Sequence, residues 1–428
     1  MTKKYGFNTR ALHAGAVIDE TNARGVPLHR TSSYVFNSTS HAADLFALKE
    51  PGNMYTRMMN PTQGVLEERM AALEGGDAAL ALASGTAAIF YAVINICGHG
   101  DEVVSANNLY GGTHTMFDSI LPELGIKTKF EDPLDPDNLE KVINDSTKML
   151  FTEVIGNPVL DVANIKTISE IAHRHHIPLV VDSTFTTPYL FRPLEHGADV
   201  VIHSLTKWLG GHGTGIGGIV VDGGKFDWTD RKFRLYNEPD PSYHGLRYAH
   251  DLGDLNPLAF ITRMRLVPLR NLGACISPDN AWMFLQGIET LPLRMRRHCD
   301  NAMAVAQYLT DHPAVKWVRY PGLEQDPAHE TASRQFENGF GGMVVFGIKG
   351  GRTAGETFIN NLGLISHLAN VGDAKSLAIH PASTTHSQLS EDQQREGGIT
   401  PDLIRLSVGI ESIEDIHADL DQALASIR

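Results

Sequence analysis

The chain of 428 residues contains little cysteine, no excess of basic residues and no long apolar run. Its three cysteines are far apart and form no Cys-x-x-Cys pair, so neither a disulfide framework nor a cysteine zinc site is indicated. The net charge of -14 argues against nucleic acid as a partner, because phosphate backbones are bound by dense Lys and Arg surfaces. No stretch of about 18 apolar residues is present to span a membrane, and the first residues lack the apolar core of a signal peptide. The sequence therefore predicts a cytoplasmic protein with no nucleic-acid or membrane partner.

The length predicts more than one domain, since single domains mostly contain about 100 to 200 residues. Residues 1–57 contain several turn signals and few periodic apolar runs, so we expect an extended N-terminal arm. Residues 58–277 alternate short β-favouring runs with helix-like segments, which predicts an α/β large domain with a mostly parallel sheet. Ser277-Pro278-Asp279 resembles the capped start of a long helix that leads into a smaller α/β domain at 278–428.

Two polar clusters directly follow predicted strands, the position where open α/β sheets bind ligands. Lys207 lies in HSLTKWLGG after an apolar strand, with the hydroxyls of Ser204 and Thr206 beside it. A lysine that forms an imine must lose its proton near neutral pH, which burial and nearby positive charge favour. Asp182 ends the preceding strand in PLVVDS, where its carboxylate could face a pyridine nitrogen or cap a turn.

Two more segments could complete such a site. Ser84, Gly85 and Thr86 lie between a strand and a helical run, where free N–H groups and the positive helix end could bind a phosphate, although small residues are common at such turns. Tyr110, in LYGG after another strand, could lie flat on a cofactor ring or be an ordinary half-buried tyrosine. A lysine, an acid, a phosphate cradle and a stacking ring are the groups that pyridoxal 5'-phosphate (PLP) enzymes require.

Other functional classes are less well supported. Gly213, Gly215 and Gly218 match a GxGxxG pattern, but the run continues into the strand GIVVDGG, so the helix that a dinucleotide site requires is missing. The 20 histidines include no HExxH motif and no zinc-site spacing, so no metal site is predicted. A nicotinamide-dependent dehydrogenase and a non-catalytic binding protein remain as alternatives of low weight.

The chain resembles the Cys/Met-metabolism family of PLP-dependent enzymes, which have the aspartate aminotransferase fold (PLP-dependent transferase fold type I). The likeness covers nearly the whole chain and rests on YTRMMNPT, SGTAA, LYGG, VVDST, HSLTKWLGGHG, SPDNAWMFLQGIETLPLRMRRH and IRLSVGIE, in the family's order. The resemblance implies that Lys207 forms the imine, that Tyr110 stacks on the ring and that Asp182 pairs with the ring nitrogen. The other residues that it implies are Asn157 near the phenolic oxygen, Arg405 at the substrate carboxylate, and Ser84, Gly85, Thr86, Thr184, Ser204 and Thr206 as cofactor ligands from the same chain, with Tyr55 and Arg57 reaching the phosphate from a neighbouring subunit.

One branch of the family is favoured by two segments. The text NVGDAKSLAIHPASTTHSQL and the polar excursion at 222–256 are similar to O-acetylhomoserine sulfhydrylases, and Asn370 stands where cystathionine-forming and cystathionine-cleaving relatives carry serine. The resemblance implies conversion of O-acetylhomoserine and sulfide to homocysteine and acetate, in methionine biosynthesis, with Asn370 at the substrate. Cystathionine γ-synthase and methionine γ-lyase are the alternatives. The sequence is compatible with sulfide, methanethiol or carrier-bound sulfur as donor, with an acetyl or succinyl ester, and with a dimer; we expect a homotetramer built from dimers with shared active sites.

Overall fold

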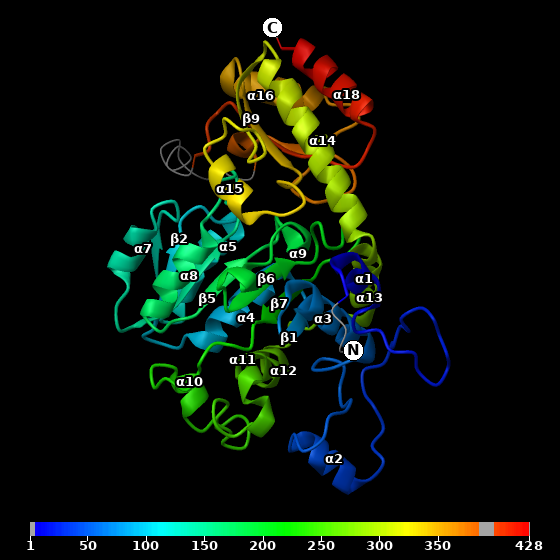
Figure 1. The fold of residues 1–428 in the computed structure, drawn as a ribbon, viewed down its shortest axis with the longest axis vertical. Helices are drawn as coiled ribbons and strands as arrows, with labels where there is room; N and C mark the ends of the chain where they lie inside the picture. The colour runs from blue at the N-terminus through cyan, green and yellow to red at the C-terminus, as the bar shows by residue number, and fades with distance from the viewer. Residues whose placement is uncertain (1–4, 385–397, 428) are drawn as a thin grey trace.

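The computed structural model describes residues 5–384 and 398–427 and places two β-sheets in two lobes of the molecule (Figure 1). The larger sheet has seven strands in the order β1-β7-β6-β5-β4-β2-β3, and β7 runs antiparallel to both of its neighbours while the other pairs are parallel. These strands are β1 Ala78–Leu82, β2 Glu102–Ala106, β3 Lys127–Glu131, β4 Thr147–Glu153, β5 Leu179–Asp182, β6 Val200–Ser204 and β7 Gly218–Asp222. The predicted α/β class with a mostly parallel sheet is confirmed.

Helices cover both faces of the larger sheet, which explains why its strands are short continuous apolar runs. Helices α3, α8 and α13 bury apolar side chains on one face, and α4 and α11 do so on the other. The helices of this lobe and the arm are α1 Phe7–His13, α2 Thr39–Phe46, α3 Pro61–Glu74, α4 Gly85–Ile96, α5 Gly111–Thr115, α6 Leu121–Glu123, α7 Pro136–Val142, α8 Ile165–Arg174, α9 Thr187–Leu190, α10 Arg234–Asn237, α11 Ala259–Met264, α12 Arg270–Leu272 and α13 Pro278–Glu289. None of the described helices is long and apolar enough to cross a bilayer.

The smaller lobe contains a five-stranded sheet in the order β10-β11-β12-β9-β8. Helices α14, α16 and α18 pack on one face of this sheet, whereas Leu403 and Val345 on the other face join the core of the larger lobe. The remaining elements are α14 Leu291–Asp311, β8 Val315–Arg319, α15 His329–Gln335, β9 Met343–Ile348, α16 Gly351–Asn361, β10 Ser366–His367, β11 Leu377–Ile379, β12 Leu403–Ser407 and α18 Ile413–Ala425. The smaller sheet therefore packs on the larger lobe through this second face, to which β12 contributes Leu403.

The predicted long helix after Ser277 is two helices. Its start agrees with the prediction, because the Ser277 side chain accepts a hydrogen bond from the Asn280 N–H at the first turn of α13. The first helix ends at Glu289, and α14 begins at Leu291 with Pro292 in its first turn. Proline has no N–H to continue a helix but is tolerated in the first turn, so a new helix starts there.

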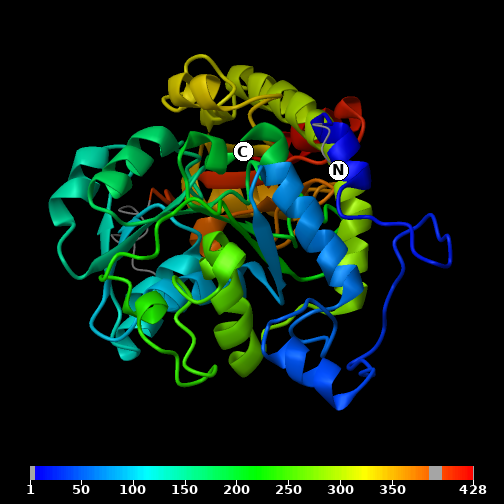
Figure 2. The same ribbon diagram turned by 60° about the horizontal axis from the view of Figure 1, so that its bottom comes forward.

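The N-terminal segment is only partly extended. Helix α1 packs on α3 and α13 and buries Ala11, so it belongs to the body of the protein. The chain that follows projects from the body and includes α2 (Figures 1 and 2). Val17 and Val35 in this projecting part are 81% and 96% exposed.

The excursion at 222–256 packs by its aromatic side chains although it has little regular structure beyond α10. The Trp228 ring stacks on Tyr236 at 4.4 Å and on Phe260 of α11 at 5.4 Å between ring centroids. All three side chains are buried. The segment is thus attached to the α4 and α11 side of the sheet.

Gly218 of β7 tests how tightly α4 is seated on the sheet. A Cβ at Gly218 would lie 2.1 Å from the Ser84 carbonyl oxygen, so Gly218→Ala must displace backbone at the start of α4. We expect Gly218→Ala to lower the free energy of unfolding by about 1 to 3 kcal/mol. The matched control is Gly64→Ala in α3, where a Cβ meets nothing within 4 Å and should stabilise by up to about 1 kcal/mol. Urea unfolding at one protein concentration measures both, and equal effects would contradict the expected contact.

Candidate active site

Four polar side chains gather where β4, β5 and β6 end side by side. Glu153 is the last residue of β4 and lies in register with Asp182, the last residue of β5. β6 runs beside β5 and ends at Ser204, and Lys207 follows in a turn in which its N–H donates to the Ser204 carbonyl oxygen. Parallel strands place their carboxyl ends at one edge of a sheet, which is why residues far apart in sequence meet here.

Lys207 is positioned by contacts with the smaller lobe. Its Nζ donates a hydrogen bond of 2.6 Å to Oδ1 of Asn370. Gly372 packs against the Lys207 turn so closely that a Cβ there would lie 2.9 Å from the Lys207 carbonyl carbon. Burial, and secondly the positive charge of Arg405, lower the pKa of Lys207 from 10.5 to about 8. A substantial fraction of this amine is therefore neutral at mildly alkaline pH.

The two carboxyl groups at the strand ends have different donors. Oδ1 of Asp182 accepts the Thr184 N–H at 2.9 Å, and burial raises the Asp182 pKa while the Thr184 hydrogen bonds act in the opposite direction. Oε1 of Glu153 accepts the Tyr110 N–H at 2.7 Å. Our reading of the sequence did not single out Glu153, although it ends the apolar strand TKMLFTE in the same way as Asp182 ends its own.

The start of α4 forms a cradle of backbone N–H groups beside β6. The Ser84 side chain accepts the Ala87 N–H and caps the helix, and the N–H groups of Gly85 and Thr86 belong to the first turn, which has no intrahelical acceptors. A Cβ at Gly85 would lie 2.8 Å from Cβ of Ser204, so only glycine allows this close approach. The Ser204 N–H donates to the Thr184 hydroxyl oxygen at 2.8 Å, which connects the cradle to the Asp182 loop.

Arg405, Asn157 and Tyr110 are three more predicted residues that contact or influence one another at the site. A fourth, Thr206, forms a hydrogen bond with the backbone of Gly217. Arg405 of β12 is 8% exposed and donates from Nη1 to Oδ1 of Asn157 at 2.9 Å, and burial lowers its pKa to about 10. The Tyr110 side chain is 52% exposed and close enough to Arg405 to affect that pKa. The Thr206 hydroxyl oxygen accepts the Gly217 N–H at 3.1 Å.

Tyr55 and Arg57 pack against each other and beside Gly273. The Arg57 guanidinium is 5.3 Å from the centre of the Tyr55 ring, and its side chain passes within 3.9 Å of the position of a Cβ on Gly273. Within the described parts of the chain, no hydrogen bond or ion pair joins Tyr55 or Arg57 to the residues around Lys207. The two residues lie at the end of the projecting segment.

The segment at 370–389, on which the sulfhydrylase branch was predicted, is described as far as Thr384. Its residues 385–389 lie outside the described residues.

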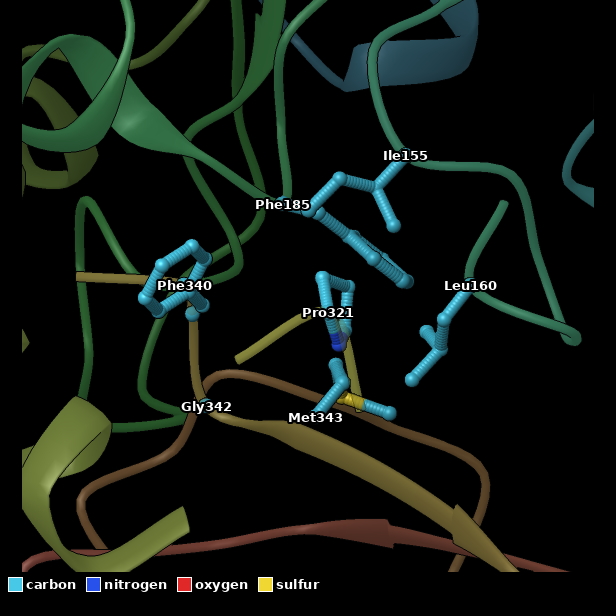
Figure 3. Close-up of a pocket in the computed structure, with 8 residues that line it drawn as sticks. Ile155, Leu160, Phe185, Pro321, Phe340, Gly342 and Met343 are labelled. Atoms are coloured by element: carbon cyan, nitrogen blue, oxygen red, sulfur yellow. The ribbon is translucent and has the colours of Figure 1, made fainter. Parts of the chain in front are cut away.

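An apolar pocket separates the two lobes behind the site (Figure 3). Its lining contains no titratable side chain. Phe185, which follows the Asp182 strand, lines it and contacts Trp208 with ring centroids 5.3 Å apart. The lining residues are Ile155, Leu160, Phe185, Pro321, Phe340, Gly341, Gly342 and Met343.

The arrangement fits PLP. Gly85 has no room for a Cβ beside Ser204, and the free N–H groups of α4 provide a cradle for a phosphate. The partly exposed Asp182 at the end of β5 can face a protonated ring nitrogen, and the Lys207 amine has a pKa low enough for covalent attachment. Fold and site together define an α/β enzyme that uses PLP.

Comparison with known proteins gives the family. The chain belongs to the Cys/Met metabolism PLP-dependent enzymes, whose family model matches residues 8–425. It is 53% identical to an O-acetyl-L-homoserine sulfhydrylase of Leptospira meyeri over all of this chain and 98% of that protein. It is 50% identical to a homocysteine synthase of Schizosaccharomyces pombe, with 98% of each chain covered. A solved structure of a candidate O-acetylhomoserine (thiol)-lyase from Campylobacter jejuni, which carries a pyridoxyl-lysine phosphate group, matches with a TM-score of 0.94 and 41% identity over 98% of this chain and 100% of that one.

The lowered pKa of Lys207 predicts the pH dependence of cofactor attachment. PLP reacts with the neutral amine, so in the apoprotein the attachment rate should rise with pH through about 8 and not through 10.5. Arg405→Met removes a positive charge that lowers this pKa, so the midpoint should move to higher pH. Stopped-flow absorbance measures the rate, a lysine derivative in solution corrects for the ionisation of PLP, and Lys207→Ala is the blank. A midpoint that Arg405→Met leaves in place would show that Arg405 does not act on the amine.

Proposed function

We propose that the chain catalyses γ-replacement on O-acetylhomoserine with sulfide, and so produces homocysteine and acetate. The observation that carries the proposal is the contact of Asn370 with Lys207, because the residue that distinguishes the sulfhydrylase branch in sequence is the hydrogen-bond partner of the proposed imine lysine. Relatives with the names O-acetyl-L-homoserine sulfhydrylase and homocysteine synthase, similar over their full lengths, support the same substrate and product. We further propose a cytoplasmic role in methionine biosynthesis.

The same proposal assigns the cofactor contacts. The backbone of Gly85 and Thr86 at the start of α4 would bind the phosphate, with hydroxyls nearby. Asp182 would pair with the ring nitrogen, and the half-exposed Tyr110 would stack on the ring. The other proposed contacts are Ser84, Thr184, Ser204 and Thr206 around the phosphate and Asn157 at the phenolic oxygen. We also propose the division into an arm at 1–57, a PLP-binding domain at 58–277 and a C-terminal domain at 278–428.

The residues of the chain divide the reaction between them. The neutral Nζ of Lys207 would take a proton from Cα of the substrate, pass it on within the site, and then take a proton from Cβ. Acetate would leave from Cγ with the bonding electrons, sulfide would add at Cγ, and protons would return to Cβ and Cα to give homocysteine. Arg405 uses one N–H for Asn157, and its planar guanidinium has further donors for the two oxygens of the substrate carboxylate. PLP, when bound, supplies the electron withdrawal that makes these C–H protons removable. The negative charge of Asp182 would keep the ring nitrogen of PLP protonated, which strengthens this electron withdrawal.

Steady-state kinetics with two sulfur donors test the substrate. We expect kcat/KM for O-acetylhomoserine with sulfide to exceed that with cysteine by about tenfold or more, since a cysteine site would need groups for a second amino acid. Asn370→Ser should reduce this ratio, whereas Asn361→Ser on the exposed side of α16 should not. Preference for cysteine would assign the chain to the cystathionine-forming branch, and release of a keto acid without any thiol would indicate a γ-lyase.

We propose that the protein assembles through its projecting segment. Val17 and Val35 are exposed there, and within the described residues no hydrogen bond or ion pair joins Tyr55 or Arg57 to Lys207. A second copy would cover the apolar side chains and bring Tyr55 and Arg57 to its own phosphate cradle. The proposed state is a homotetramer of dimers in which each site combines two chains.

Refolding two inactive variants together tests the shared site. Lys207→Ala removes the imine amine and Arg57→Ala removes the phosphate contact, so each should be nearly inactive alone. In a mixed dimer one site carries both substitutions and the other carries none. Random pairing makes about half of the dimers mixed, so about a quarter of wild-type activity should return. No recovery in confirmed mixed dimers would mean that Arg57 acts within its own chain.

A further inference from the structure

Glu153 and Asp182 form a pair of neighbouring carboxyl groups. They lie in register on adjacent parallel strands, which are about 4.8 Å apart in any sheet. Two residues before them, Phe151 and Val180 both pack into the core on the α4 side of the sheet. Side chains on a strand alternate between faces, so Glu153 and Asp182 also point to that side. Glu153 is 7% exposed and Asp182 is partly exposed, at the edge where the cofactor is expected.

When two carboxyl groups lie this close together away from water, ionising both has a high free-energy cost. The groups around them decide which one holds the charge. Each carboxyl accepts one backbone N–H, Asp182 that of Thr184 and Glu153 that of Tyr110, but Asp182 is partly exposed whereas Glu153 is only 7% exposed, so burial disfavours a charge more strongly on Glu153. Among the described residues, the Tyr110 N–H is the one group that lowers the pKa of Glu153. Burial, and secondly the charge of Asp182, outweigh it and raise this pKa well above the ordinary value.

The nearby cations do not change this asymmetry. Lys207 donates to Asn370 and Arg405 donates to Asn157, so neither forms an ion pair with Glu153 in the described structure. No basic group of the described chain contributes to the shift of the Glu153 pKa. Burial and the absence of a facing cation in the described chain therefore favour the proton on Glu153.

We propose that Glu153 is a positioning residue that works as an uncharged acid, holding the Tyr110 backbone through one oxygen and leaving the negative charge of the pair on Asp182. This inference rests on the proposed PLP site. An ionised Glu153 would compete with Asp182 for the ring proton, and loss of its oxygen would release the loop that presents Tyr110 to the ring. One neutral group thus serves both the ring nitrogen and the stacking side chain.

Two substitutions separate the charge of Glu153 from its hydrogen bond. Glu153→Gln keeps an oxygen for the Tyr110 N–H and has no charge, so the dissociation constant of PLP and kcat should stay within about twofold of wild type. Glu153→Ala leaves that N–H without an acceptor and should weaken PLP binding by about tenfold. Glu131→Gln, at the same end of the edge strand β3, is the matched control and should change neither quantity.

Infrared difference spectra report the proton itself. The spectrum of wild-type holoenzyme minus Glu153→Gln should contain the C=O stretch of a protonated carboxylic acid, with its shift in D₂O, and the difference for Glu131→Gln should not. Carboxylate bands in place of that stretch would overturn the proposal, as would a Glu153→Gln variant that loses PLP as strongly as Glu153→Ala. If Glu153→Ala does not fold, the glutamine variant and the spectrum still decide. Neither the spectrum nor PLP binding requires substrate, so a wrong substrate assignment would leave both results unchanged.

Discussion

The hydrogen bond from Lys207 Nζ to Asn370 Oδ1 joins the two lobes of the protein at the candidate site. A buried ammonium group would normally be paired with a carboxylate, and such a pair would raise its pKa. Here the acceptor is a neutral amide, so burial, and secondly the positive charge of Arg405, lower the pKa to about 8. The smaller lobe supplies both groups, since Asn370 and Arg405 belong to it. The lysine therefore acquires its chemistry only when the two sheets are docked.

A second buried cation, Arg294, holds the turn that carries Lys207. Arg294 of α14 donates to the carbonyl oxygens of Trp208 at 2.7 Å and Leu209 at 3.2 Å, and also to that of Gly287. Burial lowers the pKa of Arg294 to about 10, a cost that the backbone oxygens partly offset. Gly372 packs on the same turn from the other side. Lys207 is thus held on a rigid support, which a proton carrier between defined atoms requires.

The sequence predicted the position of the site better than its connections. Lys207 and Asp182 were predicted because charged residues directly after apolar strands must lie at the carboxyl edge of the sheet. The same rule applies to Glu153, yet one acid was enough for the predicted chemistry, and only register shows that two acids meet. The packing of helix α1 on α3 and α13 depends on tertiary contacts that local patterns do not contain, whereas the break at Thr290 had a local signal in Pro292 that the prediction of one long helix did not use. The proposed contact of Tyr55 and Arg57 with a phosphate involves a second chain, whose position the sequence of one chain does not give.

The acid pair follows from building a site at the edge of a parallel sheet. Such an edge brings polar side chains together from separate strands, even where two of them would carry charges of the same sign. In the proposed arrangement the charge stays on the partly exposed Asp182, whose Oδ1 accepts the Thr184 N–H, and the proton stays on the more deeply buried Glu153. The Thr184 hydroxyl also accepts the Ser204 N–H, so the loop that stabilises the anion also orders the phosphate cradle. Charge placement and cofactor geometry therefore depend on the same few hydrogen bonds, and a substitution at Thr184 would disturb both together.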